Sequence, residues 1–337
     1  MATALLTACA GTQVQPVTRG PLLDMTMPYS VHRLAHPHRG NSWMSPAAKR
    51  SPALLYVSSW QTNDVNVYDL SSGHEVGQLT GFQAPYGQCV DRNGDVYITD
   101  YTDGQVFEYA HGGTTLLNTY DSGGFPIGCA VDAKGDLAVT NYVTPSGAGD
   151  VCVWKHGSGS AACYSDSGSC YFLWPAGYDD KGNLIAVGRY RHYSLAVCAL
   201  LSGSSTMTTL SYNGTLKFPG SVTWDGKHFV LPDDVYEYQY TILAQATLSG
   251  STLTAVGATT IGCNTENESV DVSAPFVVGK KNTPVNHRQG KIVVGAGEVF
   301  CESQGPLIGL WQYPAGGNPY KIFDLGYAYG LSVSLAN

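Results

Sequence analysis

Five oxygen-bearing side chains in this chain of 337 residues could bind a hard divalent cation such as calcium. They are Asp100, Asn141, Asp233, Asp234 and Glu298. Carboxylate and amide oxygens are the ligands that calcium prefers in proteins. However, only Asp100 and Asn141 stand at the ends of predicted second strands, where Asp and Asn also form turns. Two such positions are too few for a metal cage, so we predict no metal, no cofactor and no catalytic residue.

Other motifs that carry chemistry are missing from the sequence. It contains no G-x-S-x-G elbow, no H-E-x-x-H pair and no phosphate-binding glycine loop. Asp91-Arg-Asn-Gly-Asp95 is similar to the start of a calcium loop, but Val96 and Thr102 stand where an EF-hand needs Gly and Glu. We interpret this segment as a glycine turn between two strands.

Aromatic residues are the remaining candidates for contact with a ligand. Two sets, one inside a Pro-x-Gly-like motif and one just after a predicted second strand, should lie at the same end of the fold: Tyr86, Phe276, Tyr329, and Trp60, Tyr101, Tyr142. Aromatic rings with nearby polar groups suit a protein, peptide or saccharide surface. Three further rings precede prolines and are expected to pack between neighbouring units: Phe125, Trp174 and Phe218.

Nine cysteines are many for a reduced compartment and favour disulfides in an exported protein. Cys152 and Cys163 stand on adjacent predicted strands and are our first pair, and Cys263 with Cys301 is our second. Cys89 and Cys129 stand four and three residues after their prolines and so point to opposite strand faces. We therefore predict that Cys89 and Cys129 are buried thiols.

A repeated motif positions all these residues. It reads Pro-x-Gly, a short apolar strand, a glycine-centred turn and a second strand, most clearly at 85–100 and 126–141 and more weakly at 175–188, 219–232, 275–295 and 328–336. Successive copies are roughly 40 to 56 residues apart, a spacing that suits four short strands per unit. Few charged residues, many glycines and many tyrosines also favour short strands and tight turns.

The number of copies predicts an all-β fold, a six-bladed β-propeller of four-stranded antiparallel blades. The final copy of the motif, at residues 329–336, has a first strand but no second strand after it. Residues 54–59 form a second strand with no first strand before it. Pairing of these two segments would close the ring, so that the C-terminal strand joins the N-terminal blade. Closure leaves only short protected edges, as a β-protein requires to avoid association.

At these motifs the chain resembles the NHL-repeat propellers and their relatives, the SMP-30/gluconolactonase-like proteins. The resemblance covers roughly residues 54–337 and implies the propeller architecture. In SMP-30-like lactonases it would also imply a divalent cation at the channel mouth, held partly by an Asn within Pro-Asn-Gly. Here the corresponding residues include Tyr86, Ile127 and Ala176, which cannot bind calcium through a side-chain oxygen. A metal-dependent, lactonase-like hydrolase or lyase with a rearranged site is therefore only the alternative.

Residues 1–53 differ from the rest of the chain and are predicted to be a leader and a Pro-containing tether whose end packs on the body. Leu6-Thr-Ala-Cys9 resembles the lipidation site of bacterial lipoproteins, which makes Cys9 the candidate acceptor. No later apolar stretch is long enough to span a membrane. We expect an exported protein at the bacterial envelope, attached to the membrane only through a lipid anchor.

The net charge of −8 offers no basic surface for nucleic acid. Together with the missing catalytic motifs, it leaves a binding or scaffold module as the expected function. We expect a monomer that contacts a protein, peptide or saccharide through the mouth of the propeller.

Overall fold

The computed structural model describes residues 41–59, 62–166, 168–190, 194–217, 220–234, 240–262, 276–278, 291–299, 307–323 and 328–336. All these residues belong to one compact unit, residues 31–337. Strands make up 55% of the structure and helix 3%, as the all-β prediction requires. The two short 3-10 helices are η1 (Ala48–Arg50) and η2 (Lys155–Gly157).

The first sheet joins segments from both ends of the described chain, in the order β1-β4-β3-β2-β26. Its strands are β1 (Trp43–Met44), β2 (Ala53–Ser59), β3 (Asp64–Asp69), β4 (Glu75–Leu79) and β26 (Gly330–Leu335). The pairing of β26 with β2 is antiparallel, with Leu55 opposite Val333, as the repeat count predicts. The sheet also includes Trp43–Met44, so part of the predicted tether is packed on the body.

The second and third sheets are antiparallel meanders of four strands each. The second contains β5 (Pro85–Val90), β6 (Val96–Asp100), β7 (Gln105–Tyr109) and β8 (Leu116–Asp121). The third contains β9 (Pro126–Val131), β10 (Leu137–Asn141), β11 (Asp150–Trp154) and β12 (Ala162–Tyr164). Between β5 and β6 the chain makes the predicted glycine turn, since Gly94 has a φ of 85° and Asp91 accepts hydrogen bonds from the backbone N–H groups of Asn93 and Asp95.

The remaining strands form a nine-stranded sheet and a four-stranded last sheet. The nine-stranded sheet contains β13 (Phe172–Leu173), β14 (Gly177–Tyr178), β15 (Leu184–Arg189), β16 (Leu195–Leu200), β17 (Thr208–Asn213), β18 (Thr223–Trp224), β19 (Phe229–Asp234), β20 (Tyr240–Ser249) and β21 (Thr252–Gly262). The last sheet contains β22 (Phe276–Val278), β23 (Lys291–Val299), β24 (Leu307–Tyr313) and β25 (Lys321–Phe323). Within the nine-stranded sheet, a parallel pairing of β17 with β21 joins two antiparallel halves.

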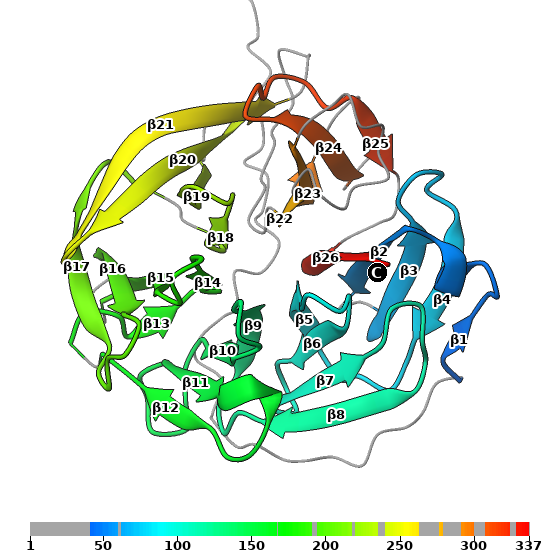
Figure 1. Cartoon of the computed structure of the whole chain (residues 1–337), viewed down its shortest axis with the longest axis horizontal. Helices are drawn as coiled ribbons and strands as arrows, with labels where there is room; N and C mark the ends of the chain where they lie inside the picture. The colour runs from blue at the N-terminus through cyan, green and yellow to red at the C-terminus, as the bar shows by residue number, and fades with distance from the viewer. Residues whose placement is uncertain are drawn as a thin grey trace, which may run out of the picture. The chain divides into compact units, whose positions relative to one another are not determined.

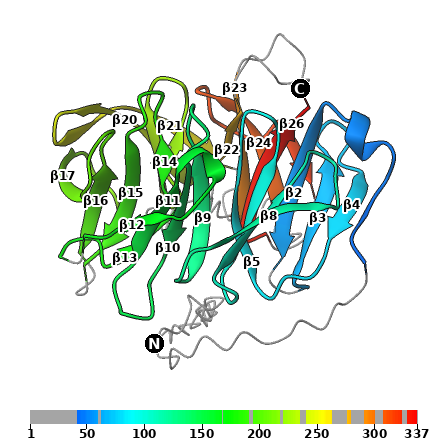
Figure 2. The same cartoon turned by 60° about the horizontal axis from the view of Figure 1, so that its bottom comes forward.

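The sheets follow one another around a common axis, and each turns one edge toward the centre (Figure 1). Their strands run from one face of this ring to the other (Figure 2). Neighbouring inner strands contact each other in the closed sequence β26, β5, β9, β14, β18, β22 and back to β26. The apolar core is therefore divided into clusters between successive sheets, for example between the second and third.

Glycine in the Pro-x-Gly motif allows this close approach of the inner strands. A Cβ atom on Gly87 would lie 2.2 Å from the carbonyl oxygen of Ile127 on the next inner strand. The same holds around the ring, since a Cβ on Gly177 would lie 2.5 Å from the carbonyl oxygen of Val222. A Cβ on Gly330 would lie 2.1 Å from the carbonyl oxygen of Tyr86. The repeated glycine is thus a packing requirement of the ring and carries no chemistry.

Three disulfide bonds occur in the described part of the chain. Cys152 and Cys163 are directly opposite on β11 and β12 and form the predicted hairpin bridge. The other two join Cys89 to Cys129 and Cys170 to Cys198. Cys263 and Cys301 lie outside the described residues. The disulfides are compatible with an extracytoplasmic protein.

The prediction that Cys89 and Cys129 are thiols was wrong. They do point to opposite faces of their own sheets, but successive sheets in a ring pack with opposite faces together. Cys89 on the second sheet and Cys129 on the third therefore meet in one buried cluster, with their Cα atoms 5.4 Å apart. A cysteine on one face of a sheet can therefore bond to a cysteine on the opposite face of the next sheet.

Two further observations concern membrane attachment. None of the helices in the described ranges has the length and apolar character needed to cross a bilayer. Cys9 and the rest of the predicted leader lie outside these ranges.

Candidate functional site

Four of the predicted contact residues belong to a row of aromatic side chains. The ring centroids of Tyr86 and Tyr329 are 5.9 Å apart, and those of Tyr86 and Tyr101 are 6.3 Å apart. The row continues through Phe125, whose ring lies 5.2 Å from that of Tyr101. We use the name aromatic row for six residues: Tyr329, Tyr86, Tyr101, Phe125, Tyr142 and Phe172.

The second half of the row crosses from the third sheet to the nine-stranded sheet. The backbone N–H of Tyr142 donates to the carbonyl of Phe125, and both residues belong to one apolar cluster. Tyr142 stacks on Phe172 with ring centroids 5.2 Å apart. The row therefore links parts of four sheets. Tyr142 is buried, whereas the other five rings are half-buried and keep part of their surface accessible.

A cation extends the row at its end on the nine-stranded sheet. The ring of Trp174 lies 6.1 Å from that of Tyr142, and the guanidinium carbon of Arg189 lies 5.1 Å from the centroid of Trp174. The Nε atom of Arg189 is buried and has no hydrogen-bond partner among the described residues. Such a stacked Arg is characteristic of recognition surfaces.

Tyr86, which contacts both Tyr329 and Tyr101, is suited to contact and hydrogen bonding but not to proton transfer near neutral pH. Burial raises the pKa of Tyr86 to about 12, and the neighbouring phenols of Tyr329 and Tyr101 contribute to the rise. The phenol of Tyr86 therefore stays protonated and can donate one hydrogen bond. A general base would need a pKa close to the working pH.

Among the other predicted aromatic residues, Phe125 and Trp174 pack between neighbouring sheets as predicted. Trp60, Phe218 and the side chain of Phe276 lie outside the described part of the structure. Sequence reasoning missed Phe172 and Arg189, because neither occupies a repeated motif position. The adjacent apolar and aromatic residues at 171–174 were the only available signal.

The strand-end residues considered as metal ligands hold loops instead. The carboxylate of Asp100 accepts hydrogen bonds from the backbone N–H groups of Gln83 at 2.7 Å and Ala84 at 3.1 Å. The Oδ1 atom of Asp233 accepts one from the backbone N–H of Lys217 at 2.7 Å. In both cases the donor lies in the segment before the strand that pairs with the acceptor's strand, β5 for Asp100 and β18 for Asp233.

Asn141 has the same role in the third sheet. Its Oδ1 accepts a hydrogen bond from Ser122 Oγ at 2.8 Å, and its Nδ2 donates to the carbonyl oxygen of Ser122 at 3.1 Å. Asp100 and Asn141 are both fully buried. The repeat therefore ends in a polar residue because that residue anchors the incoming loop. The side chains of Asp234 and Glu298 lie outside the described part of the structure.

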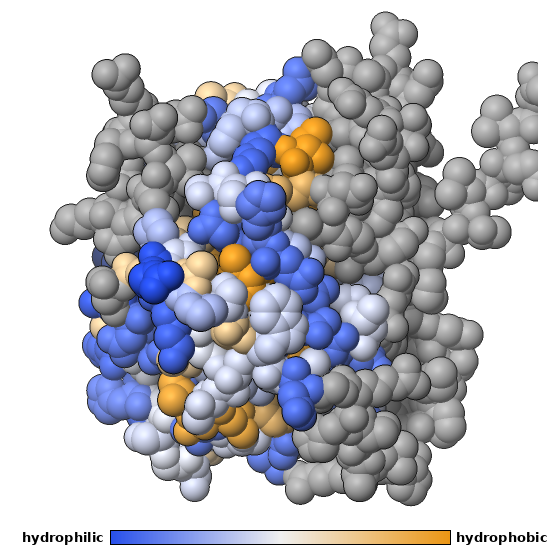
Figure 3. All heavy atoms as spheres, turned by 90° about the vertical axis from the view of Figure 1, so that its right-hand side faces the viewer, coloured by the Kyte–Doolittle hydropathy of each residue, from blue (hydrophilic) through white to orange (hydrophobic). Residues whose placement is uncertain are grey.

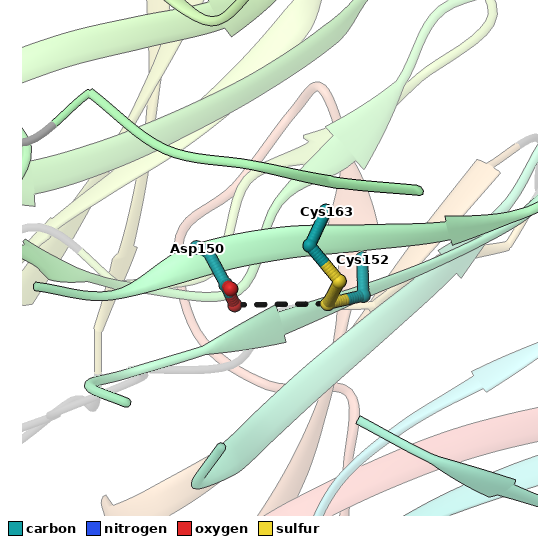
Figure 4. A group of neighbouring side chains, drawn as sticks. All are labelled: Asp150, Cys152 and Cys163. Atoms are coloured by element: carbon teal, nitrogen blue, oxygen red, sulfur yellow. Dashed lines mark hydrogen bonds between the residues drawn. A yellow bond between two sulfur atoms is a disulfide. The ribbon is translucent and has the colours of Figure 1, made fainter. Parts of the chain in front are cut away.

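A second group with metal-ligating atoms lies on β11 and β12, where Asp150, Cys152 and Cys163 are within 4.8 Å of one another (Figure 4). The two sulfur atoms are bonded to each other, so they offer no thiolate to a metal. The Oδ1 atom of Asp150 lies 3.8 Å from Cys152 Sγ and accepts a hydrogen bond from Asn141 Nδ2 at 2.7 Å. Burial raises the pKa of Asp150, and this hydrogen bond opposes the rise. We interpret the group as structural.

The outer side of the ring has no comparable aromatic row within the described ranges on the side that carries β4. On the side that carries β4, the described residues are mostly hydrophilic, and hydrophobic ones form small separate spots (Figure 3). Scattered apolar residues of this kind are normal for a protein surface.

Comparison with known proteins gives the fold. No protein-family model matches the chain, and no curated protein matches its sequence. Among solved structures, a chain of Kuenenia stuttgartiensis hydrazine synthase is similar, with 14% identity, a TM-score of 0.51, and coverage of 82% of this chain and 80% of that one. This neighbour is a β-propeller-type protein. The chain has the β-propeller fold.

Two other structures are similar to this propeller over nearly their whole length. A Bacteroides caccae protein of unknown function shares 10% identity and a TM-score of 0.54, covering 84% of this chain and 99% of that one. A chain of a nidogen/laminin complex shares 15% identity and a TM-score of 0.50, covering 85% of this chain and 99% of that one. At these identities the likeness concerns the fold alone, and propellers host many unrelated functions.

Proposed function

We propose that this protein is an exported six-bladed propeller that binds a protein or peptide partner through the aromatic row. The observation that carries the proposal is the row of aromatic side chains from Tyr329 to Phe172, five of which are partly accessible, extended by Trp174 and Arg189. Tyr, Trp and Arg are the residues most enriched among those that dominate binding energy at protein interfaces. Half-buried tyrosines also lose little conformational entropy on binding.

The proposed number of six blades treats the nine-stranded sheet as two units. Its halves are antiparallel in themselves and are joined into one sheet by the parallel pairing of β17 with β21 at their outer edges. Their inner strands β14 and β18 contact each other without forming a ladder. Six inner strands, one for each unit, contact their neighbours in a closed sequence. An NHL- or SMP-30-like arrangement of six blades accounts for both observations.

A peptide selection would test the contact surface. A displayed library of random peptides is selected on the wild-type protein, and the affinities of the selected peptides are then measured by calorimetry. Tyr101→Ser and Arg189→Ala should each weaken binding by about tenfold or more. Tyr320→Ser is the matched control, since Tyr320 is exposed and lies outside the row. Equal affinity for all four proteins, or binding of saccharides but no peptide at the row, would contradict the proposal.

Export and lipid attachment at Cys9 form the second part of the proposal. The lipoprotein-like Leu6-Thr-Ala-Cys9 segment and the three disulfides support it. Cells that express the full chain and receive a labelled fatty acid should incorporate the label into the wild-type protein and not into Cys9→Ser. Recovery of unlabelled wild-type protein in the cytoplasm would contradict it.

A calcium-dependent lactonase-like activity remains the alternative function, and the contacts of Asp100, Asn141 and Asp233 do not favour it. A thermal-shift titration separates the two, because a cation that binds the folded state raises the melting temperature. We expect calcium chloride and a chelator to leave the melting temperature unchanged. A rise with calcium that Asp100→Asn abolishes would support the alternative.

A further inference from the structure

A cavity of about 460 Å³ lies between the outer strand of the second sheet and the β11–β12 connection of the third. None of the residues that line it belongs to the aromatic row. Residues 118–121 on β8 line one side, and Trp154 with residues 158–161 line the other. Ligand sites in proteins typically have volumes of roughly 300 to 1,000 Å³, so the cavity has room for a small ligand.

Two aromatic rings line the inner part of the cavity. Tyr120 and Trp154 meet edge to face with centroids 5.4 Å apart, and both belong to the apolar cluster between the second and third sheets. The indole Nε1 of Trp154 donates to no described residue and is not among the buried polar atoms that lack a partner, so it is accessible. An accessible indole N–H can donate one hydrogen bond to a ligand.

Neighbouring polar groups hold the tyrosine in position before any ligand arrives. The hydroxyl of Tyr120 donates to Glu108 Oε2 at 2.8 Å, and that of Tyr97 donates to Glu108 Oε1 at 3.0 Å. The Cys89–Cys129 disulfide belongs to the same cluster and links the two sheets that form the cavity. A site fixed in this way loses little entropy on binding, which favours affinity.

The entrance of the cavity is polar and carries little charge. Asn118, Asp121, Ser158 and Ser160 are exposed there and offer an amide, a carboxylate and two hydroxyls. The lining residues include no Lys, Arg or His. A phosphate or carboxylate ligand would therefore find no cationic side chain among the lining residues. Apart from the two rings and Ala161, the lining offers no apolar side chain for a lipid.

A neutral saccharide combines the properties that this cavity selects. Its C–H groups can contact the small accessible parts of Trp154 and Tyr120, which are 5% and 4% exposed, while its hydroxyls exchange hydrogen bonds with amide and hydroxyl groups. We propose that the cavity between β8 and the β11–β12 connection is a binding site for a neutral mono- or disaccharide, with Trp154 and Tyr120 as the aromatic wall and Asn118 and Ser160 at the entrance. This site is additional to the proposed peptide surface.

Saturation-transfer NMR on the full chain tests the site with glucose, N-acetylglucosamine and cellobiose, each alone at millimolar concentration. At least one probe should receive saturation from the wild-type protein. Ser160→Trp, which fills the entrance, and Asn118→Ala should each weaken this binding by about tenfold or more. Ser205→Trp is the matched control, because Ser205 is also exposed and lies outside the cavity. Circular dichroism verifies that each variant is folded.

Tyr101→Ser separates this proposal from the peptide surface. It should weaken peptide binding at the aromatic row and leave saccharide binding unchanged. If none of the three probes binds, or if binding persists in Ser160→Trp, the saccharide site is refuted. Binding that is lost in Tyr101→Ser and kept in Ser160→Trp would assign the saccharide to the aromatic row, and would also refute it.

Discussion

Asp100 illustrates what a polar residue at the end of a propeller repeat does. Its fully buried carboxylate accepts two backbone hydrogen bonds from the loop that leads into β5. Burial of a carboxylate is costly unless donors surround it. The carboxylate of Asp100, which we considered as a cation ligand, instead holds the segment of chain that joins the first sheet to the second.

Replacing Asp100 tests this role. In Asp100→Ala the backbone N–H groups of Gln83 and Ala84 lose their acceptor, so we expect a loss of roughly 2 to 3 kcal/mol in the free energy of unfolding. Urea denaturation measures it. Asp180→Ala is the control, since Asp180 is exposed and should change stability by less than about 0.5 kcal/mol. Equal stability of the two variants would show that Asp100 does not anchor the loop.

A second carboxylate makes stability depend on pH. Burial disfavours ionisation of Asp69, but hydrogen bonds from Ser51, Ser71 and Ser72 outweigh burial and hold its pKa well below the ordinary range. Because the folded-state pKa lies below the unfolded-state value, the stabilisation is present above about pH 4 and is lost as the pH falls below it.

The pH dependence is checked with Asp69→Asn. At neutral pH the variant should be less stable than the wild type, and the difference in unfolding free energy should shrink as the pH falls from about 4 toward the folded-state pKa. Urea denaturation at a series of pH values provides the measurement. A difference that stays constant down to the acid limit would contradict the assignment.

At the scale of elements, the inner strands explain the repeated motif. Pro-x-Gly places a residue without a side chain where one inner strand passes the backbone of the next. The outer strands differ, because they carry the cavity and the hairpin disulfide. The inner strands therefore maintain the ring, whereas both ligand surfaces that we propose lie at the ends of strands or at the outer edges.

Gly87→Ala tests the packing between inner strands. The new methyl group would lie 2.2 Å from a backbone oxygen, which cannot move away as a flexible side chain could. We expect a loss of more than about 2 kcal/mol in stability. Gly168→Ala is the control, since its Cβ would meet nothing closer than 3.4 Å and its stability should change little. A stable Gly87→Ala variant would show that the inner strands can separate.

For the whole molecule, closure of the ring depends on the last described strand. β26 pairs with β2 and contacts β5, so it completes the first sheet and adjoins the second. Buried hydrogen bonds reinforce this junction, since Gln88 Nε2 donates to Ser58 Oγ at 2.7 Å and Ser332 Oγ donates to Gln88 Oε1 at 2.8 Å.

Removal of residues 328–337 should open the ring. The deletion exposes the inner edge of β2 and leaves the apolar side chains that pack on Leu331 and Val333 in water. We expect a melting temperature lower by more than about 10 °C, or loss of a cooperative transition, in calorimetry. Deletion of Asn337 alone is the control and should have no effect. An unchanged transition in the longer deletion would show that closure does not stabilise the fold.

The sequence by itself determined the features that depend on local spacing. The hairpin turn at Asp91–Asp95, the Cys152–Cys163 bridge and the pairing of residues 329–336 with 54–59 all follow from short-range alternation and from counting the repeats. Each repeat is nearly independent of the others at this level, so its pattern can be read without knowledge of its neighbours.

Only the tertiary structure decided how neighbouring sheets meet. Cys89 bonds to Cys129 because opposite faces of successive sheets pack together, a relation that no single repeat contains. Phe172 joins the aromatic row because it packs on Tyr142 of the neighbouring sheet, and Arg189 extends the row over Trp174. Trp154 lines the cavity with Tyr120 because the second and third sheets pack together. Asp100 and Asn141 became loop anchors for the same reason: their partners are brought close by the path of the chain from one sheet to the next. Contacts between sheets join residues that are far apart in the sequence, and the repeat does not encode them.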